Sequence, residues 1–213
     1  MIIYHGSNKV IKEPIFGKGK VYNDYGLGFY CTESNELAKE WACNKDSDGY
    51  SNKYELDLSG LKVLNLNDKK YSILHWLTLL IQYRNFEIRS DLIRLSKEFL
   101  IENYSIDISG YDVIIGYRAD DSYFTFAQDF LSNRISLRKL EKAMKLGKLG
   151  EQVVLKSKKA FENIKFLDVE IANKNIYFAL RNVRDLASRK DYFELREEVN
   201  LDDIFIMDLI RGK

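Results

Sequence analysis

Short apolar or alternating runs along the chain predict its strands. The stretch 54–58 is the clearest alternating case, because Tyr54, Leu56 and Leu58 are separated by acidic residues, as in a strand with one buried face. The run 111–116 is instead continuous and rich in β-branched residues, which is typical of a strand buried on both faces. On the same grounds strands are expected at 1–4, 29–30, 54–58, 61–66, 111–116, 152–155 and 164–171.

Apolar residues at helical spacing predict the helices. In the first of them, Leu37, Trp41 and their neighbours fall on one face, and Thr32 or Ser34 is suited to cap its start. The polar or glycine-containing stretches 9–24 and 44–52 are expected to be loops. Helices are expected at 35–43, 73–84, 92–100, 123–131, 137–146 and 158–163, and mainly helical chain is expected from 173 onward.

The order of these elements predicts an α+β fold. Strands and helices follow one another irregularly, whereas a doubly wound parallel sheet requires regular alternation. The glycine pair Gly26 and Gly28 does not indicate a dinucleotide-binding turn, because Cys31 stands where the third glycine belongs. With no internal repeat or flexible linker, we expect one domain at 1–172 and a C-terminal helical extension packed on it at 173–213.

Composition narrows the environment but indicates no activity. The 213 residues carry a formal charge of +1, so no global field attracts the chain to nucleic acid or to a membrane. No window approaches the roughly 20 apolar residues of a membrane span, and no signal peptide is recognisable, so a reducing cytoplasm is the expected compartment. Cys31 and Cys43, with the histidines His5 and His75, do not have the spacing of a zinc site, and no metal is expected.

Three features near the start of the chain have the spacing of a known site. Tyr4-His5-Gly6-Ser7 follows the first strand, Gly26-Leu27-Gly28-Phe29-Tyr30 leads into a helix, and Trp41 comes after ten intervening residues. This pattern resembles the nicotinamide-binding half of the ADP-ribosyltransferase superfamily, in its diphtheria-toxin and poly(ADP-ribose)-polymerase branch. Within that branch it is similar to a small bacterial toxin-like family formerly of unknown function. The resemblance covers about residues 1–170 and implies a split β-sandwich with an NAD cleft.

The resemblance implies roles for individual residues. His5 would bond a ribose hydroxyl, the backbone of Gly6 would hold the nicotinamide amide, and Tyr30 and Trp41 would enclose the nicotinamide ring. Loss of nicotinamide leaves a cation-like sugar, so ring stacking and firm ribose contacts suit this chemistry. The NAD-binding residues expected are His5, Gly6, Ser7, Gly28, Phe29, Tyr30, Trp41 and Arg118, with Arg118 as a partner for a phosphate.

The fit is looser at the position of the catalytic glutamate. Most active members of the superfamily have a glutamate at the start of a later strand, and Gln152 aligns with it here, preceded by Glu151. Neighbours on a strand point to opposite faces, so one of the two is expected to enter the cleft. A glutamine cannot act as a base, and Asp120 or Asp121 is the candidate proton acceptor in that case. The catalytic set expected is His5, Tyr30, Gln152, Glu151, Asp120 and Asp121.

These features imply an NAD-dependent ADP-ribosyltransferase that passes ADP-ribose to a protein or nucleic acid. The resemblance implies the toxin of a bacterial toxin-antitoxin or anti-phage system, with a neutralising antitoxin protein as partner and NAD as substrate. The basic residues between Arg134 and Lys165 outnumber the acidic ones, which suits a nucleic-acid acceptor if they flank the cleft and a solvated helix face otherwise. Two alternatives stay open: an inactive module that binds a nucleotide, nucleic acid or partner protein, and an enzyme that transfers ADP-ribose to water.

Overall fold

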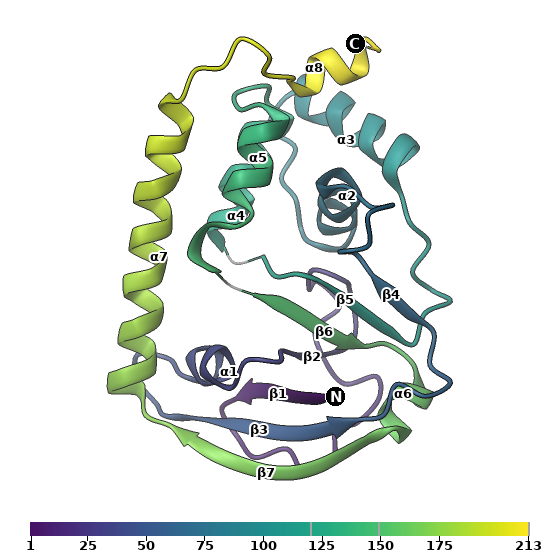
Figure 1. Ribbon diagram of the computed structural model, residues 1–213, viewed down its shortest axis with the longest axis vertical. Coiled ribbons are helices and arrows are strands. Elements are labelled where there is room, and N and C mark those ends of the chain that lie inside the picture. Colours follow the sequence, from purple (N-terminus) through teal and green to yellow (C-terminus); the bar gives the residue numbers. More distant parts are fainter. Residues whose placement is uncertain (120, 149, 213) are drawn as a thin grey trace.

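Two sheets form the centre of the protein. The computed structural model describes residues 1–119, 121–148 and 150–212, without the side chains of 121–123. The first sheet is antiparallel and contains β1 (Ile2–Ser7), β3 (Gly49–Leu56) and β7 (Ile164–Ala172) in the order β1-β3-β7. This sheet forms the base of the molecule in the view of Figure 1.

The second sheet lies between the first sheet and most of the helices (Figure 1). It contains β2 (Phe29–Cys31), β4 (Val63–Asn65), β5 (Val113–Tyr117) and β6 (Glu151–Leu155) in the order β2-β6-β5-β4. The pair β4 and β5 is parallel and the other pairs are antiparallel. An isolated antiparallel bridge between Tyr4 and Thr32 joins the two sheets where β1 meets the end of β2.

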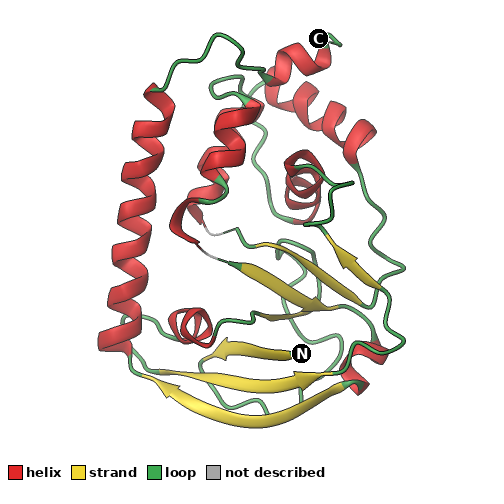
Figure 2. Ribbon diagram, in the orientation of Figure 1, coloured by secondary structure: helices red, strands yellow, loops and turns green. Residues whose placement is uncertain are grey.

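Most of the helices gather on the far side of the second sheet and along one flank, whereas α1 and α6 lie beside the first sheet (Figure 2). Helix α7 runs up this flank, and α2 to α5 cover the second sheet. In chain order they are α1 (Asn35–Ala42), α2 (Ile73–Tyr83), α3 (Asp91–Tyr104), α4 (Asp121–Leu131), α5 (Leu137–Ala143), the 3-10 turn η1 (Leu146–Lys148), α6 (Lys158–Glu162), α7 (Lys174–Glu197) and α8 (Ile206–Ile210). The predicted α+β class is therefore confirmed.

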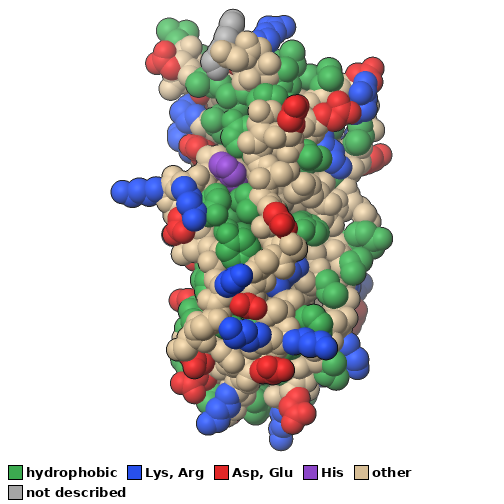
Figure 3. Space-filling view, turned by 90° about the vertical axis from the view of Figure 1, so that its right-hand side faces the viewer, with side chains coloured by type: hydrophobic (Ala, Val, Ile, Leu, Met, Phe, Trp, Pro, Cys, Tyr) green, Lys and Arg blue, Asp and Glu red, His purple; other side chains and the backbone are tan. Residues whose placement is uncertain are grey.

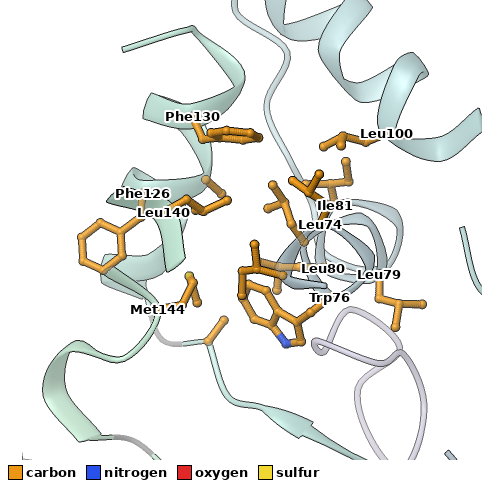
Figure 4. Packing of buried hydrophobic residues seen from close by; sticks show 14 of the residues in the cluster. Leu74, Trp76, Leu79, Leu80, Ile81, Leu100, Phe126, Phe130, Leu140 and Met144 are labelled. Atoms are coloured by element: carbon orange, nitrogen blue, oxygen red, sulfur yellow. The ribbon is translucent and has the colours of Figure 1, made fainter. Parts of the chain in front are cut away.

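Two apolar cores hold these layers together. The larger lies between the second sheet and the helices, where Leu74 and Leu80 of α2 lie opposite Phe130 of α4 and Leu140 of α5 (Figure 4). The smaller core takes residues from both sheets, among them Ile3, Tyr54, Val113 and Val153. The two sheets therefore pack face to face, and the apolar alternation along β3 is what this packing requires.

Two strands extend further than predicted. The first continues through His5, Gly6 and Ser7, because all three pair in register with β3. The stretch 44–52, predicted to be a loop, contains the start of β3 from Gly49. Ser51 of this strand is polar and buried. Its hydroxyl donates a hydrogen bond to the Asn35 side chain, so a tertiary contact satisfies this buried polar group.

The long helix α7 is tied to the rest of the chain by polar contacts of its side chains. Arg184 forms an ion pair with Glu40 of α1, and the hydroxyl of Tyr192 donates to Asp129 of α4 at 2.7 Å. Among the described helices, none combines the length and the apolar character that crossing a bilayer would require.

Candidate functional site

A polar pocket of about 190 Å³ forms where the two sheets, α1 and the end of α2 come together. Residues distant in sequence meet here, because β1, β2 and β6 each contribute a side chain or a backbone segment. The lining residues are His5, Gly6, Asn23, Asp24, Tyr30, Trp41, Arg84, Arg118, Ala119 and Gln152. The prediction that Tyr30 and Trp41 face a common cleft is confirmed.

A second, more apolar pocket of about 580 Å³ adjoins the first beneath the loop 9–19. Both pockets are lined by His5, Asn23 and Tyr30, so these residues stand at the boundary between them. A volume of about 190 Å³ is below the roughly 300 Å³ of ordinary ligand pockets, whereas about 580 Å³ falls within their range. The smaller pocket alone is therefore too small for a ligand as long as a dinucleotide.

His5 is held in one tautomer by its contacts. Its Nδ1 lies 2.7 Å from the carbonyl oxygen of Tyr30, and its ring stacks on Phe29 with centroids 4.3 Å apart. A carbonyl oxygen only accepts, so Nδ1 carries the proton and Nε2 of the neutral ring is an acceptor. Burial lowers the pKa of His5 below its usual value of 6.5, and this outweighs the opposing effect of the Tyr30 bond. The imidazole is therefore neutral at pH 7.

This lowered pKa predicts that stability falls in mild acid. The unfolded chain takes up the His5 proton near pH 6.5 and the folded chain only at lower pH, so the free energy of unfolding decreases as the pH falls below about 6.5. Thermal unfolding at pH 7.5 and 5.5 measures the effect. In His5→Asn, whose amide can replace the Nδ1 donor, the decrease in melting temperature should be smaller than in the wild type, and an equal decrease in both proteins would contradict the assignment.

Tyr30 connects the pocket to the glycine-containing turn before it. Its hydroxyl donates to the carbonyl oxygen of Gly26 at 2.6 Å and accepts from the backbone nitrogen of Tyr25 at 3.0 Å. Gly26 has a φ of 71°, a conformation that side-chain-bearing residues rarely adopt. The hydroxyl of Tyr30 is thus occupied by the turn, and its half-buried ring is what it offers to the pocket.

Gly6 and Gly28 are required by packing. A Cβ atom on Gly6 would lie 2.0 Å from the carbonyl oxygen of Ala38 in α1. A Cβ atom on Gly28 would lie 2.6 Å from Val154 Cγ1 in β6. Gly6 therefore permits α1, the helix that contains Trp41, to lie directly against β1. This packing requires a glycine at position 6 whether or not a ligand contacts it.

Trp41 is covered on one face by an arginine. The guanidinium carbon of Arg118 lies 3.6 Å from the centroid of the Trp41 ring, which is a close cation–π contact. Arg118 follows β5 in the chain, so it approaches α1 from the second sheet. A flat ligand that stacks on this face of Trp41 must displace Arg118.

Gln152 faces the pocket and Glu151 does not. The Gln152 side chain is 5 % exposed, and its Nε2 donates to Asp24 Oδ2 at 3.0 Å. Glu151 is exposed and accepts from the Asn67 side chain at 2.8 Å, outside the pocket. The alternation of strand neighbours is thus observed, with the amide inside and the carboxylate outside.

Asp24 is a pocket residue that the sequence did not single out. It is 3 % exposed, and its Oδ2 accepts from the Ala119 backbone nitrogen at 3.0 Å as well as from Gln152. Its Oδ1 accepts no hydrogen bond from any described residue, although Arg84 Nη1 lies 3.4 Å away. Burial raises the pKa of Asp24 more than its hydrogen bonds and the two arginines lower it.

The family of the chain follows from a match that contains this whole pocket. A family model described as "Protein of unknown function (DUF3990)" matches residues 1–166. The chain belongs to the DUF3990 family. Every residue that lines the two pockets falls within the matched range, whereas helix α7 of this DUF3990 protein lies beyond it. Comparison with curated proteins and with solved structures gives no match for this chain.

Several residues named from the sequence lie elsewhere in this DUF3990 protein. The Ser7 hydroxyl donates to the carbonyl oxygen of Lys9 and lines neither pocket. Phe29 lines the larger pocket beneath the stacked His5 ring. Asp120 lies outside the described residues, and Asp121 begins α4 without a described side chain.

Four of the basic residues between 134 and 165 are held by contacts away from the pockets. Arg138 and Lys142 form ion pairs with Glu198, while Lys139 donates to the carbonyl oxygen of Arg196. Lys156 Nζ donates to two backbone oxygens, those of Tyr25 and Leu27, and burial lowers its pKa to about 8. On the face that Figure 3 shows, basic and acidic side chains are intermingled. The contacts of these four residues are structural, and none of them lines either pocket.

The residues missed from the sequence are Asp24 and Arg84. Asp24 stands at the end of the stretch predicted to be a loop, and Arg84 follows the last turn of α2. Neither lies in a recognisable motif, since a lone charged residue in a loop or at a helix end is most often solvated. Among the described residues, no group of three or more histidine, cysteine, aspartate or glutamate side chains is arranged to hold a metal ion.

Proposed function

We propose that this protein is an NAD-dependent ADP-ribosyltransferase that cleaves the bond between nicotinamide and ribose and transfers ADP-ribose to a macromolecular acceptor. The observation that carries the proposal is the meeting of His5, Gly6, Tyr30, Trp41 and Gln152 in one pocket. These are the positions to which the resemblance assigns NAD contacts, and they come from β1, β2, α1 and β6. A structural role for each residue separately would not require that they share a pocket.

The hydrogen-bonding character of the pocket supports a sugar as ligand. Gln152 Oε1 and Asp24 Oδ1 are buried and accept no hydrogen bond from described residues, although Arg84 forms an ion pair with Asp24 Oδ1. His5, whose Nε2 is a further acceptor, lines the same pocket. Buried acceptors without donors are unfavourable, at a cost of about 1–3 kcal/mol each. Ribose hydroxyls supply donors to such acceptors, whereas a purely apolar ligand would leave them unsatisfied.

The charges of the pocket support a ligand that also carries phosphate. The guanidinium groups of Arg84 and Arg118 accompany a single carboxylate, Asp24, among the described residues of the lining. Arginine is well suited to phosphate because its planar fork of donors matches the phosphate oxygens. The adjoining apolar pocket offers the room for the adenosine half that the smaller pocket lacks.

The proposed setting is that of a cytoplasmic bacterial toxin with an antitoxin protein as partner. It rests on the resemblance of residues 1 to about 170 to the toxin-like family. We propose the acceptor only by its class, which is a protein or a nucleic acid. If water were the acceptor instead, the protein would deplete NAD without modifying a macromolecule.

One observation favours a second candidate function. The pocket holds the amide of Gln152 where most active members of the superfamily carry a glutamate. A protein that had lost transfer in this way would keep the pocket and bind a nucleotide or a partner without cleaving NAD. The two candidates therefore differ in nicotinamide release and not in binding.

Incubation with NAD labelled in its adenine distinguishes them. Purified protein and cell extract are incubated together and then separated into protein and nucleic-acid fractions, with His5→Ala and Trp41→Ala as site variants and Phe193→Ala, an exposed aromatic on α7, as the matched control. We expect label in one fraction with the wild type and the control and none with the site variants. Nicotinamide release without label in either fraction would identify hydrolysis, and binding of NAD without release would favour the non-catalytic module.

A further inference from the structure

Among the described residues that line the pocket, one carboxylate is present, and it belongs to Asp24. Asp24 is 3 % exposed, and its two oxygens are used differently. Oδ2 is fixed by two donors, the Gln152 side chain and the Ala119 backbone nitrogen, each at 3.0 Å. Oδ1 forms an ion pair with Arg84 Nη1 at 3.4 Å but accepts no hydrogen bond from a described residue, so a ligand in the pocket can donate one to it.

The same contact sets the orientation of Gln152. An ionised carboxylate only accepts, so the amide nitrogen of Gln152 must be the atom that faces Asp24. Its Oε1 is then directed away from Asp24 and is buried with no donor among the described residues. Gln152 is thereby prepared to accept a hydrogen bond from a hydroxyl, but an amide cannot take up a proton near neutral pH.

Two other acids near the pocket whose side chains the structure describes, Glu151 and Glu40, do not offer this geometry. Glu151 is exposed and bonded to Asn67 outside the pocket. Glu40 is buried next to Trp41 in the chain, but it accepts a hydrogen bond from Arg184 of α7 and does not line the pocket. Of the described residues that line the pocket, Asp24 is the one with a carboxylate.

We infer that Asp24 is the catalytic carboxylate of this site and takes the role that a glutamate at position 152 has in most of the superfamily. The inference rests on the proposed function. In the transfer step the bond between C1′ of the ribose and the nicotinamide nitrogen breaks, and its electron pair neutralises the pyridinium. The bond between C1′ and the acceptor forms as the proton of the acceptor passes to Asp24 Oδ1, from which water later removes it.

The arrangement suits both parts of this step. The carboxylate faces the cation-like sugar from a buried position, where electrostatic stabilisation is stronger than in water. Burial raises the pKa of Asp24, which makes it a better base than an exposed aspartate. Because its pKa is raised in the folded chain, ionisation of Asp24 lowers the free energy of unfolding as the pH rises through that pKa.

The carboxylate can be exchanged between the two positions to test the inference. Asp24→Asn removes the acid, and Asp24→Asn combined with Gln152→Glu reverses the pair, so that an amide at 24 donates to a carboxylate at 152. General-base catalysis contributes about 10²–10⁴ in rate, so Asp24→Asn should lower nicotinamide release from NAD at least about 100-fold. The reversed pair should recover at least about a tenth of the wild-type rate, and Asp191→Asn, an exposed aspartate of α7, is the control expected to be unchanged.

Three readouts separate the outcomes. Thermal melting establishes that Asp24→Asn is folded, which must be shown because the substitution also removes the ion pair with Arg84. Wild-type activity should fall toward low pH as Asp24 is protonated, and the residual activity of Asp24→Asn should lack this dependence. Activity of Asp24→Asn within threefold of the wild type, with the same pH profile, would overturn the role of Asp24 and leave the proposed function intact. Absence of NAD cleavage by the wild type would overturn both.

Discussion

Substitution of Gly6 by alanine is expected to lower the free energy of unfolding by about 3 kcal/mol, at the upper end of ordinary overpacking. The added Cβ atom would lie 2.0 Å from the carbonyl oxygen of Ala38 and 2.9 Å from the backbone nitrogen of Ala42. Both are backbone atoms of α1, so no side chain can rotate to relieve the overlap and the whole helix must move. Because α1 contains Trp41, nicotinamide release should fall with stability.

The matched control for this substitution is Gly110→Ala. A Cβ atom on Gly110 meets no atom within 4 Å, so the change should stay within about 0.5 kcal/mol of the wild type. For a chain of this size, about 3 kcal/mol corresponds to a decrease of roughly 6–12 °C in melting temperature, which differential scanning calorimetry resolves. Equal melting temperatures for the two variants would show that α1 does not need the close approach to β1.

Substitution of Trp41 by alanine is expected to weaken NAD binding by roughly 5- to 150-fold. Stacking of a base on an aromatic side chain contributes about 1–3 kcal/mol, and 1.4 kcal/mol is a factor of ten in affinity. In the proposed complex the nicotinamide ring takes the place of the Arg118 guanidinium, which lies 3.6 Å from the Trp41 ring centroid. Isothermal titration with NAD measures the loss, and Trp41→Phe should retain most of the affinity because a phenyl ring also stacks.

The fluorescence of Trp41 gives an independent test of the same contact. The chain has two tryptophans, and Trp76 is 2 % exposed in the large core, so a change on NAD addition should come from Trp41. The Trp41→Phe variant should lose this change. If NAD bound with unaltered affinity to Trp41→Ala, the nicotinamide ring would not stack on this residue, and the orientation proposed for the ligand would be wrong.

Much of the secondary structure could be predicted because its signals are local. The apolar face of α1 and its Ser34 cap both depend on residues that are close together in the sequence. The Ser34 side chain accepts a hydrogen bond from the Leu37 backbone nitrogen. The predicted ends of strands were wrong where tertiary contacts outweigh the local preference of the residues. Ser51 and Asn52 have the composition of a loop, but they form a strand because each finds buried partners in other segments.

The alternation along β6 shows what the sequence predicts and what only the tertiary structure decides. Period two alone states that Glu151 and Gln152 point to opposite faces. It does not state which face meets the pocket, because that depends on how β6 lies between β5 and β2. Gln152 pairs with Gly116 and Glu151 with Tyr117, and this register directs the amide toward Asp24.

The sequence by itself determined the α+β class and most strands and helices, since these depend on periodicity. Its resemblance to a known superfamily singled out His5, Gly6, Tyr30 and Trp41, from motifs within the first 41 residues. Only the tertiary structure decided that Asp24 and Arg84 join that group and that Arg118 covers Trp41. It also supplied the packing requirement for Gly6. The physical reason is that burial, hydrogen-bond partners and close approach are properties of segments brought together by folding, and no single segment contains them.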